Sequence, residues 1–159
     1  MKLIINYVTM LSLVIILQGC NSNKSFKLES PDGTIVFTIC PSPSTDPDAI
    51  ASFSLSTGNR KILEPSYLKL VTDIPWGSGE FRAIRSGYES VRSTWTNDFG
   101  ERKEVPDNYN QLKIFMASGD FKMNLICRAY DEGAAFAWEI PGQQGPESVV
   151  INDENISFR

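Results

Sequence analysis

The sequence contains no histidine, and this absence excludes several kinds of active site. Serine and cysteine hydrolases of the usual kind need an imidazole base beside the nucleophile, and histidine is also the commonest metal ligand in proteins. The chain also lacks the glycine-rich phosphate loop, the cysteine spacing of zinc sites and the acidic calcium-binding loop. These patterns therefore offer no catalytic or metal site on this chain.

Basic residues are in the minority. The chain has 15 Lys and Arg against 19 Asp and Glu, a net charge of -4 and a pI near 4.9. Proteins that bind nucleic acid need a basic face for the phosphates, so this balance argues against a nucleic-acid partner. Mild acidity is common in exported proteins and does not decide the fold.

Long apolar runs are scarce, and the one present lies at the N-terminus. Residues 3–17 are apolar but too short for an ordinary membrane span, and they end in Leu17-Gln18-Gly19-Cys20, the pattern of a bacterial lipoprotein cleavage site. We expect residues 1–20 to be a signal peptide with Cys20 as the lipidation site, and residues 21–25 to be a tether. The protein would then be lipid-anchored in the bacterial cell envelope, periplasmic or on the outer membrane. The alternative is an ordinary secretory signal in which the cysteine falls there by chance.

Cysteine is also scarce. With Cys20 assigned to the lipid, only Cys40 and Cys127 remain of the three cysteines. In an exported protein they could form a disulfide. The alternative is two separate thiols that pack as small apolar residues, which we favour because the sequence gives no distance between them.

The rest of the chain consists of short alternating runs separated by glycine and proline. The clearest are two hairpins: residues 112–116 turn at 118–120 into residues 121–129, and these turn at 131–133 into residues 136–140. Further strands are expected at residues 34–40, 51–55, 61–64, 67–71 and 88–96, with proline-containing loops or bends at 41–48, 64–66 and 75–79.

No segment is a convincing helix, and each strand has one apolar face that a second sheet must cover. The sequence therefore predicts that residues 26–159 form one all-β domain, an antiparallel β-sandwich. Ile156 and Phe158 look like the start of another strand shortly before the last residue, Arg159. We therefore expect the sandwich to be incomplete at its C-terminus.

Asn108, Tyr109 and Asn110 form the most unusual polar cluster. Amides match sugar hydroxyls and an aromatic ring matches the C–H face of a sugar, so the cluster is a candidate carbohydrate contact. The alternative is a loop whose polar side chains hold the backbone and whose tyrosine packs into the sandwich. Trp76, in a Pro-Trp-Gly loop, is a second candidate sugar platform, whereas Trp138 is expected in the core.

Carboxylates are numerous, but no pair stands out as the two that glycoside hydrolysis needs. Asp131 and Glu132 are expected to be turn residues, and the alternating charges of residues 101–104 are expected to solvate a loop. No residue of this chain is predicted to be catalytic, and none is predicted to bind a metal.

Four motifs follow one another along the chain: Ser30-Pro31-Asp32-Gly33; Leu63-Glu64-Pro65-Ser66 with Leu68 and Leu70; Gly100-Glu101 through Tyr109-Asn110; and Arg128-Ala129-Tyr130-Asp131-Glu132-Gly133 with Phe136 and Glu139-Ile140-Pro141. In this order they resemble the N-terminal domain of glycoside hydrolase family 97, which comprises α-glucosidases and α-galactosidases. Three positions depart from the family's pattern: Lys69 in the second motif stands where glycine is usual, and Pro106 and Gln111 at the third motif replace a usual arginine and glutamate.

The resemblance implies a β-sandwich of super-sandwich, carbohydrate-binding type that packs on a catalytic barrel absent from this chain. It implies α-linked glycans as substrates of the full enzyme, and calcium as its cofactor with ligands outside this chain. On this interpretation the chain is a partial domain without catalysis of its own. The alternatives are a free-standing carbohydrate-binding lipoprotein, with Trp76 and residues 108–110 on the glycan, and an adaptor lipoprotein with no ligand.

Overall fold

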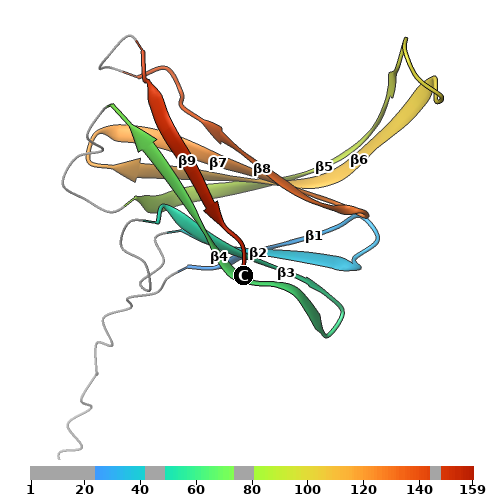
Figure 1. Ribbon diagram of the computed structural model, residues 1–159, viewed down its shortest axis with the longest axis horizontal. Helices are drawn as coiled ribbons and strands as arrows, with labels where there is room; N and C mark the ends of the chain where they lie inside the picture. The colour runs from blue at the N-terminus through green and yellow to red at the C-terminus, as the bar shows by residue number, and fades with distance from the viewer. Residues whose placement is uncertain (1–23, 42–48, 74–80, 144–147) are drawn as a thin grey trace, which may run out of the picture.

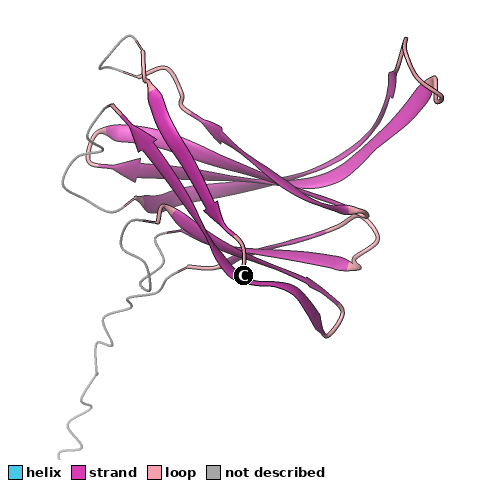
Figure 2. Ribbon diagram, viewed as in Figure 1, coloured by secondary structure: helices cyan, strands magenta, loops and turns pink. Residues whose placement is uncertain are grey.

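The computed structural model describes residues 24–41, 49–73, 81–143 and 148–159, and every regular element in these segments is a β-strand (Figure 2). None of these residues forms a helix that could cross a membrane. The predictions for residues 1–20, most of the tether, the proline loop at 42–48 and Trp76 lie outside the described residues. The strands are β1 (Phe26–Glu29), β2 (Ile35–Pro41), β3 (Ala51–Thr57), β4 (Arg60–Thr72), β5 (Arg82–Thr96), β6 (Glu104–Ser118), β7 (Phe121–Tyr130), β8 (Gly133–Glu139) and β9 (Ile151–Ser157).

Two antiparallel sheets pack face to face (Figure 1). Sheet A has the order β1-β2-β3-β4-β9, and sheet B has the order β5-β6-β7-β8. The predicted all-β antiparallel sandwich is therefore confirmed.

Alternation along the strands builds the core between the sheets. In β2 every second residue from Ile35 is buried, and the same period buries Leu112, Ile114 and Met116 in β6. On β7 the buried set includes Met123, Leu125 and Cys127, as the pattern predicted. Each such apolar side chain contributes roughly 1.5–3 kcal/mol on leaving water, so the facing rows hold the sheets together.

The two predicted hairpin turns are also confirmed: residues 119–120 join β6 to β7, and residues 131–132 join β7 to β8. Gly119 has a φ of 58°. Only glycine adopts this left-handed backbone without a steric cost from a Cβ atom, so glycine suits this turn.

The predicted end of a strand at Glu64 is wrong, because β4 runs continuously from Arg60 to Thr72, and the bend expected at Glu64–Ser66 is a bulge within it. Phe53 pairs with Ser66 and Leu55 with Leu63, so the bulged pair Glu64 and Pro65 lies opposite a single residue of β3. Proline has no backbone N–H to donate, but a bulge leaves one residue outside the hydrogen bonds between the strands. Pro65 therefore does not end the strand.

Other differences from the expected strands are changes of boundary. Pro41, expected in the loop, is the last residue of β2, where it pairs with Ala51. The strand expected near Ile156 begins earlier, at Ile151, and pairs with β4. The short strand β1 was not anticipated, because four residues show too little alternation to be recognised.

Cys40 and Cys127 are both free thiols, which confirms the second alternative for these cysteines. Cys127 faces the core, whereas Cys40 follows the fully buried Ile39 and so lies on the opposite face of β2. Burial raises the pKa of both thiols, that of Cys127 to about 12.

Strands β5 and β6 extend beyond the sandwich as a two-stranded ribbon (Figure 1). Strand β7 pairs with β6 only from Asn110 onward, whereas β5 and β6 remain paired as far as Thr96 and Glu104. We call residues 91–109 the hairpin arm. The alternative of a loop at Asn108–Asn110 is therefore wrong: pairing with β5 overrides the turn preference of asparagine.

Candidate functional site at the base of the hairpin arm

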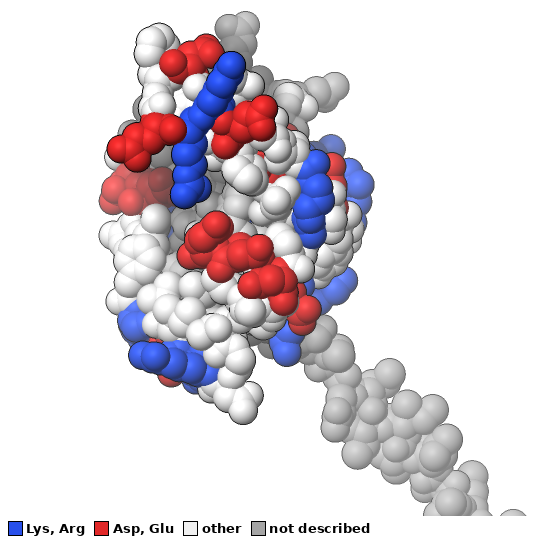
Figure 3. Space-filling view, turned by 90° about the vertical axis from the view of Figure 1, so that its right-hand side faces the viewer, with Lys and Arg blue, Asp and Glu red and all other residues white. Residues whose placement is uncertain are grey.

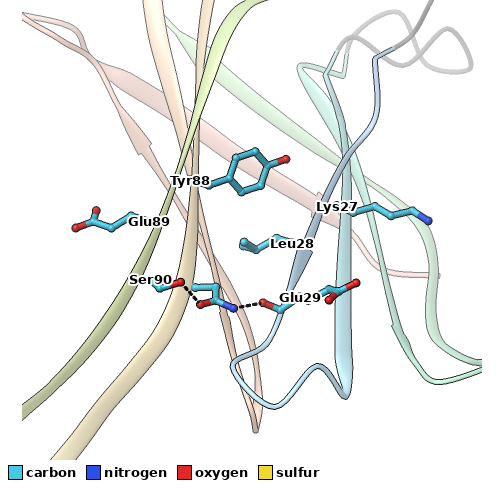
Figure 4. A pocket seen from close by; sticks show the side chains of 7 residues that line it. Lys27, Leu28, Glu29, Tyr88, Glu89 and Ser90 are labelled. Atoms are coloured by element: carbon cyan, nitrogen blue, oxygen red, sulfur yellow. Dashed lines mark hydrogen bonds between the residues drawn. The ribbon is translucent and has the colours of Figure 1, made fainter.

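A groove of about 340 Å³ lies between β1 and β5, next to the base of the arm (Figure 4). Tyr88 is 59% exposed, and its ring projects into the gap beside Leu28. An exposed aromatic ring beside polar side chains is chemically suited to a sugar. The lining residues are Lys27, Leu28, Glu29, Tyr88, Glu89, Ser90 and Asn110.

Asn110 is the one candidate sugar-contact residue in this groove. Its Oδ1 accepts a hydrogen bond from Ser90 Oγ at 2.7 Å, and its Nδ2 donates to the carbonyl oxygen of Glu29 at 2.8 Å. The second bond joins β6 of sheet B to β1 of sheet A. Asn110 therefore clamps the two sheets and shapes the groove.

Replacing Asn110 with alanine is expected to lower the free energy of unfolding by about 1–2 kcal/mol, because it removes both hydrogen bonds and leaves their partners unsatisfied. Urea denaturation of the two proteins measures the difference. Asn108→Ala is the matched control, since Asn108 lies exposed on the arm, and it should change the value by less than about 0.5 kcal/mol. Equal effects of the two substitutions would contradict the clamp.

Tyr109 lies on the face of β6 opposite the core residues Leu112 and Ile114, yet it is only 7% exposed. The Arg128 guanidinium carbon lies 4.2 Å from its ring centroid, and the Tyr130 ring centroid lies 5.2 Å away. The ring is therefore covered by neighbouring side chains, as the second alternative for this cluster expected. It packs on the outer face of sheet B, however, and not into the core. Cation–π contacts of this kind stabilise by about 0.5–1 kcal/mol at exposed sites.

The three residues of the predicted cluster therefore lie in three environments. Asn108 is exposed on the arm, Tyr109 is packed under Arg128, and Asn110 bridges the sheets. The sequence placed them side by side, but strand alternation turns neighbours to opposite faces. Carbohydrate contact at these residues stays a prediction, as it does at Trp76.

The first and last motifs of the resemblance touch each other at one end of the sandwich. The backbone N–H of Asp32, in the β1–β2 turn, donates to Asp131 Oδ1 at 2.9 Å. Asp131 does lie in the β7–β8 turn as predicted, and it also joins the two sheets. Ser30 Oγ–H at 2.6 Å and the backbone N–H of Thr34 at 2.9 Å donate to Asp32 Oδ1, and these bonds lower the pKa of Asp32 to about 2.

This lowered pKa predicts a loss of stability in acid. The folded value of about 2 lies below the ordinary value of 3.8, so the stabilising contribution is present above about pH 4 and is lost as the pH falls toward 2. Asp32→Asn should lower the melting temperature at neutral pH and flatten its decline in acid, as melting curves from about pH 2 to pH 6 would show. Asp120→Asn, in the β6–β7 turn, is the control and should keep the decline. An unchanged acid decline in the Asp32 variant would contradict the assignment.

Two further carboxylates are held in structural contacts. Glu139 forms an ion pair with Lys113 and accepts a hydrogen bond from Asn124 at 2.7 Å, and its pKa is lowered by these partners. Glu154 Oε1 accepts a hydrogen bond from Trp138 Nε1 at 3.0 Å, and Trp138 packs against the core as expected. A lowered pKa is the opposite of what a general acid needs.

The described residues include no group of three or more Cys, Asp and Glu placed to hold a metal ion. The calcium that the resemblance implies for full-length enzymes, with ligands outside this chain, stays a prediction. At the end of the sandwich from which the arm projects, acidic and basic side chains are interspersed (Figure 3). Several acidic side chains lie together near the middle of this face, with basic side chains above and beside them (Figure 3).

Comparison with protein-family models matches residues 28–159 to the model described as Glycosyl-hydrolase 97 N-terminal. Among solved structures, the chain is similar to a Glycoside Hydrolase Family 97 enzyme in complex with acarbose from Pseudoalteromonas sp. strain K8. The identity is 24% and the TM-score 0.70, over 84% of this chain and 20% of that chain. A second structure from that strain, in complex with panose, matches with the same values.

A β-arabinopyranosidase is similar as well, with 21% identity and a TM-score of 0.72 over 84% of this chain and 21% of that chain. These structural likenesses show a shared sandwich fold. The chain spans about a fifth of the length of these solved enzymes.

Proposed function

Since the chain belongs to the glycosyl-hydrolase 97 N-terminal family, we propose that it is the non-catalytic β-sandwich domain of a family 97-like glycoside hydrolase, packing on a catalytic barrel outside these 159 residues. The observation behind this proposal is the family match over residues 28–159, nearly the whole described fold. The site geometry agrees with it, because Glu139 and Glu154 are engaged in structural contacts.

The substrate we propose for the whole enzyme is an α-linked glycan. Acarbose and panose are the ligands named for two of the similar enzymes, whereas a third is named a β-arabinopyranosidase. Related sandwiches are thus found in enzymes with different substrates. This supports separate roles for the two domains: the barrel selects the sugar, and the sandwich stabilises the whole enzyme.

Two measurements test the proposal together. We expect the reading frame beyond codon 159 to encode a barrel domain, and the purified 159-residue chain to leave an aryl α-glucoside intact. The longer product should hydrolyse it. Hydrolysis by the short chain itself would overturn the non-catalytic assignment, and a frame with no barrel would overturn the role as an enzyme domain.

The alternative function, a free-standing carbohydrate-binding lipoprotein, is favoured by one observation: Tyr88 is exposed in the groove. Calorimetric titration of the chain with maltooligosaccharides tests it. Binding that Tyr88→Ala abolishes would support this alternative, whereas a flat titration would exclude it for these sugars.

We also propose that Cys20 is lipidated and anchors the protein in the bacterial cell envelope. The support is the apolar run followed by Leu17-Gln18-Gly19-Cys20. Metabolic labelling with radioactive palmitate should mark the native chain in the membrane fraction and not the Cys20→Ser variant. Equal labelling of both would contradict the proposal.

A further inference from the structure

The hairpin arm carries large apolar side chains that the sandwich leaves uncovered. Trp95 is 50% exposed and Phe99, in the loop at its tip, is 91% exposed. The arm has no third strand, because β7 stops pairing with β6 at Asn110. A two-stranded ribbon of this kind is marginally stable in water unless something packs against it.

The apolar side chains on the two strands of the arm lie on one face. Val91 is paired with Tyr109 and Trp95 with Val105, and alternation places all four on the outer face of sheet B, away from the core. We call Val91, Trp95 and Val105 the outer stripe. It continues the packed surface that Tyr109 forms with Arg128.

Hydrogen bonds hold the arm in shape from its base to its tip. Arg92 Nη1 donates to the carbonyl oxygens of Val91 and Tyr109 at 2.7 and 3.2 Å. At the tip the N–H of Asn97 donates to the carbonyl of Lys103 at 2.8 Å. These bonds reduce the conformational entropy that the arm would lose when a partner packs against it.

We propose that the outer stripe and Phe99 are the surface by which this sandwich docks onto the catalytic domain of its own polypeptide. The inference rests on the proposed function and adds the residues that make the contact. About four-fifths of the length of the similar enzyme lies outside the matched region, since the match covers 20% of that chain. Trp95 is the expected centre of the interface, because tryptophan is enriched among residues that dominate binding energy.

The occupant is expected to be a mixed polar and apolar protein surface. The end of the sandwich beside the arm shows interspersed charges of both signs (Figure 3). A rim of this kind around an aromatic centre is the usual composition of a protein–protein interface.

The test measures binding of the 159-residue chain, with Cys20→Ser, to a separately expressed catalytic domain encoded beyond codon 159. We expect Trp95→Ala to weaken the dissociation constant at least about tenfold. Phe99→Ala is the second variant, because a residue that is 91% exposed can be truncated without disturbing the fold. Ile62→Ala on sheet A is the matched control at 48% exposure and should change affinity less than about twofold.

Limited trypsin digestion is a second measurement of whether the catalytic domain covers the arm. Arg102 and Lys103 lie at the exposed tip of the arm, so cleavage there should be rapid in the isolated chain and slow in the complex. Circular dichroism of each variant checks that the sandwich is intact.

The outcomes separate the two proposals. If the catalytic domain binds the unmodified chain and both arm variants equally, the docking surface is wrong and the proposed function stands. If the isolated chain dimerises through the arm and Trp95→Ala breaks the dimer, a second copy is the occupant and the inference is overturned. If no catalytic domain is encoded, both proposals fail.

Discussion

Replacing Leu125 with alanine should lower the free energy of unfolding by about 3 kcal/mol. Leu125 has no exposed surface, and it stands between Ile114 and Trp138 in the registers of its two neighbouring strands. The facing sheet covers it, so the space left by the lost methyl groups cannot be filled by water or by easy rearrangement.

Urea denaturation of the chain with Cys20→Ser provides the measurement, and Ile126→Ala provides the control. Ile126 is the next residue along β7 but is half-buried on the outer face. The substitution Ile126→Ala should lower the free energy of unfolding markedly less than Leu125→Ala does. Similar losses at both positions would mean that β7 does not separate a core face from an outer face as described.

Cys40 is expected to react with a disulfide reagent much faster than Cys127. The thiolate is the reactive form, and the pKa of Cys127, raised from 9.0 to about 12, lowers its thiolate fraction about 1000-fold at neutral pH relative to an ordinary thiol. Burial of the sulfur adds a further barrier. Cys40 is half-buried on the outer face of β2 and should react first.

Timed labelling with Ellman's reagent in native buffer measures both rates, again with Cys20→Ser. The Cys40→Ala variant should show almost no reaction until urea unfolds it, whereas Cys127→Ala should react as the parent does. Rapid native labelling of the Cys40→Ala variant would contradict the burial of Cys127.

The raised pKa of Cys127 also predicts a loss of stability in alkali. The folded state holds the thiol proton more tightly than the unfolded state. The contribution of the protonated thiol to the free energy of unfolding is therefore fully present below about pH 9 and is lost as the pH rises toward about 12. Melting curves over this range should fall more steeply for the parent than for Cys127→Ala. Parallel curves would show that the thiol plays no part.

The sequence predicted the strands and their buried side chains most accurately where every second residue of a strand is apolar. Residues 112–116 and 121–129 alternate without interruption, and β6 and β7 place these side chains as expected. Prediction failed at Pro65, because a bulge opposite Ser54 cannot be seen from the strand that contains it. It also failed at Asn108–Asn110, where pairing with a distant strand outweighs local turn preference.

The groove beside Tyr88 was beyond prediction for a different reason. It forms where β1 of one sheet approaches β5 of the other, and no local pattern specifies how two sheets align along their length. The clamp from Asn110 to Glu29 shows the same limit: the residue type was noticed, but its partner lies 81 positions earlier.

The connectivity of the sandwich has a consequence for how it is made. Sheet B is a simple meander of sequential hairpins, whereas sheet A is completed only when Ser157 reaches Tyr67. Contacts between nearby residues form quickly, and those across long stretches form slowly. During synthesis the edge of β4 therefore stays open until β9 emerges, and in that interval it can mispair with other chains.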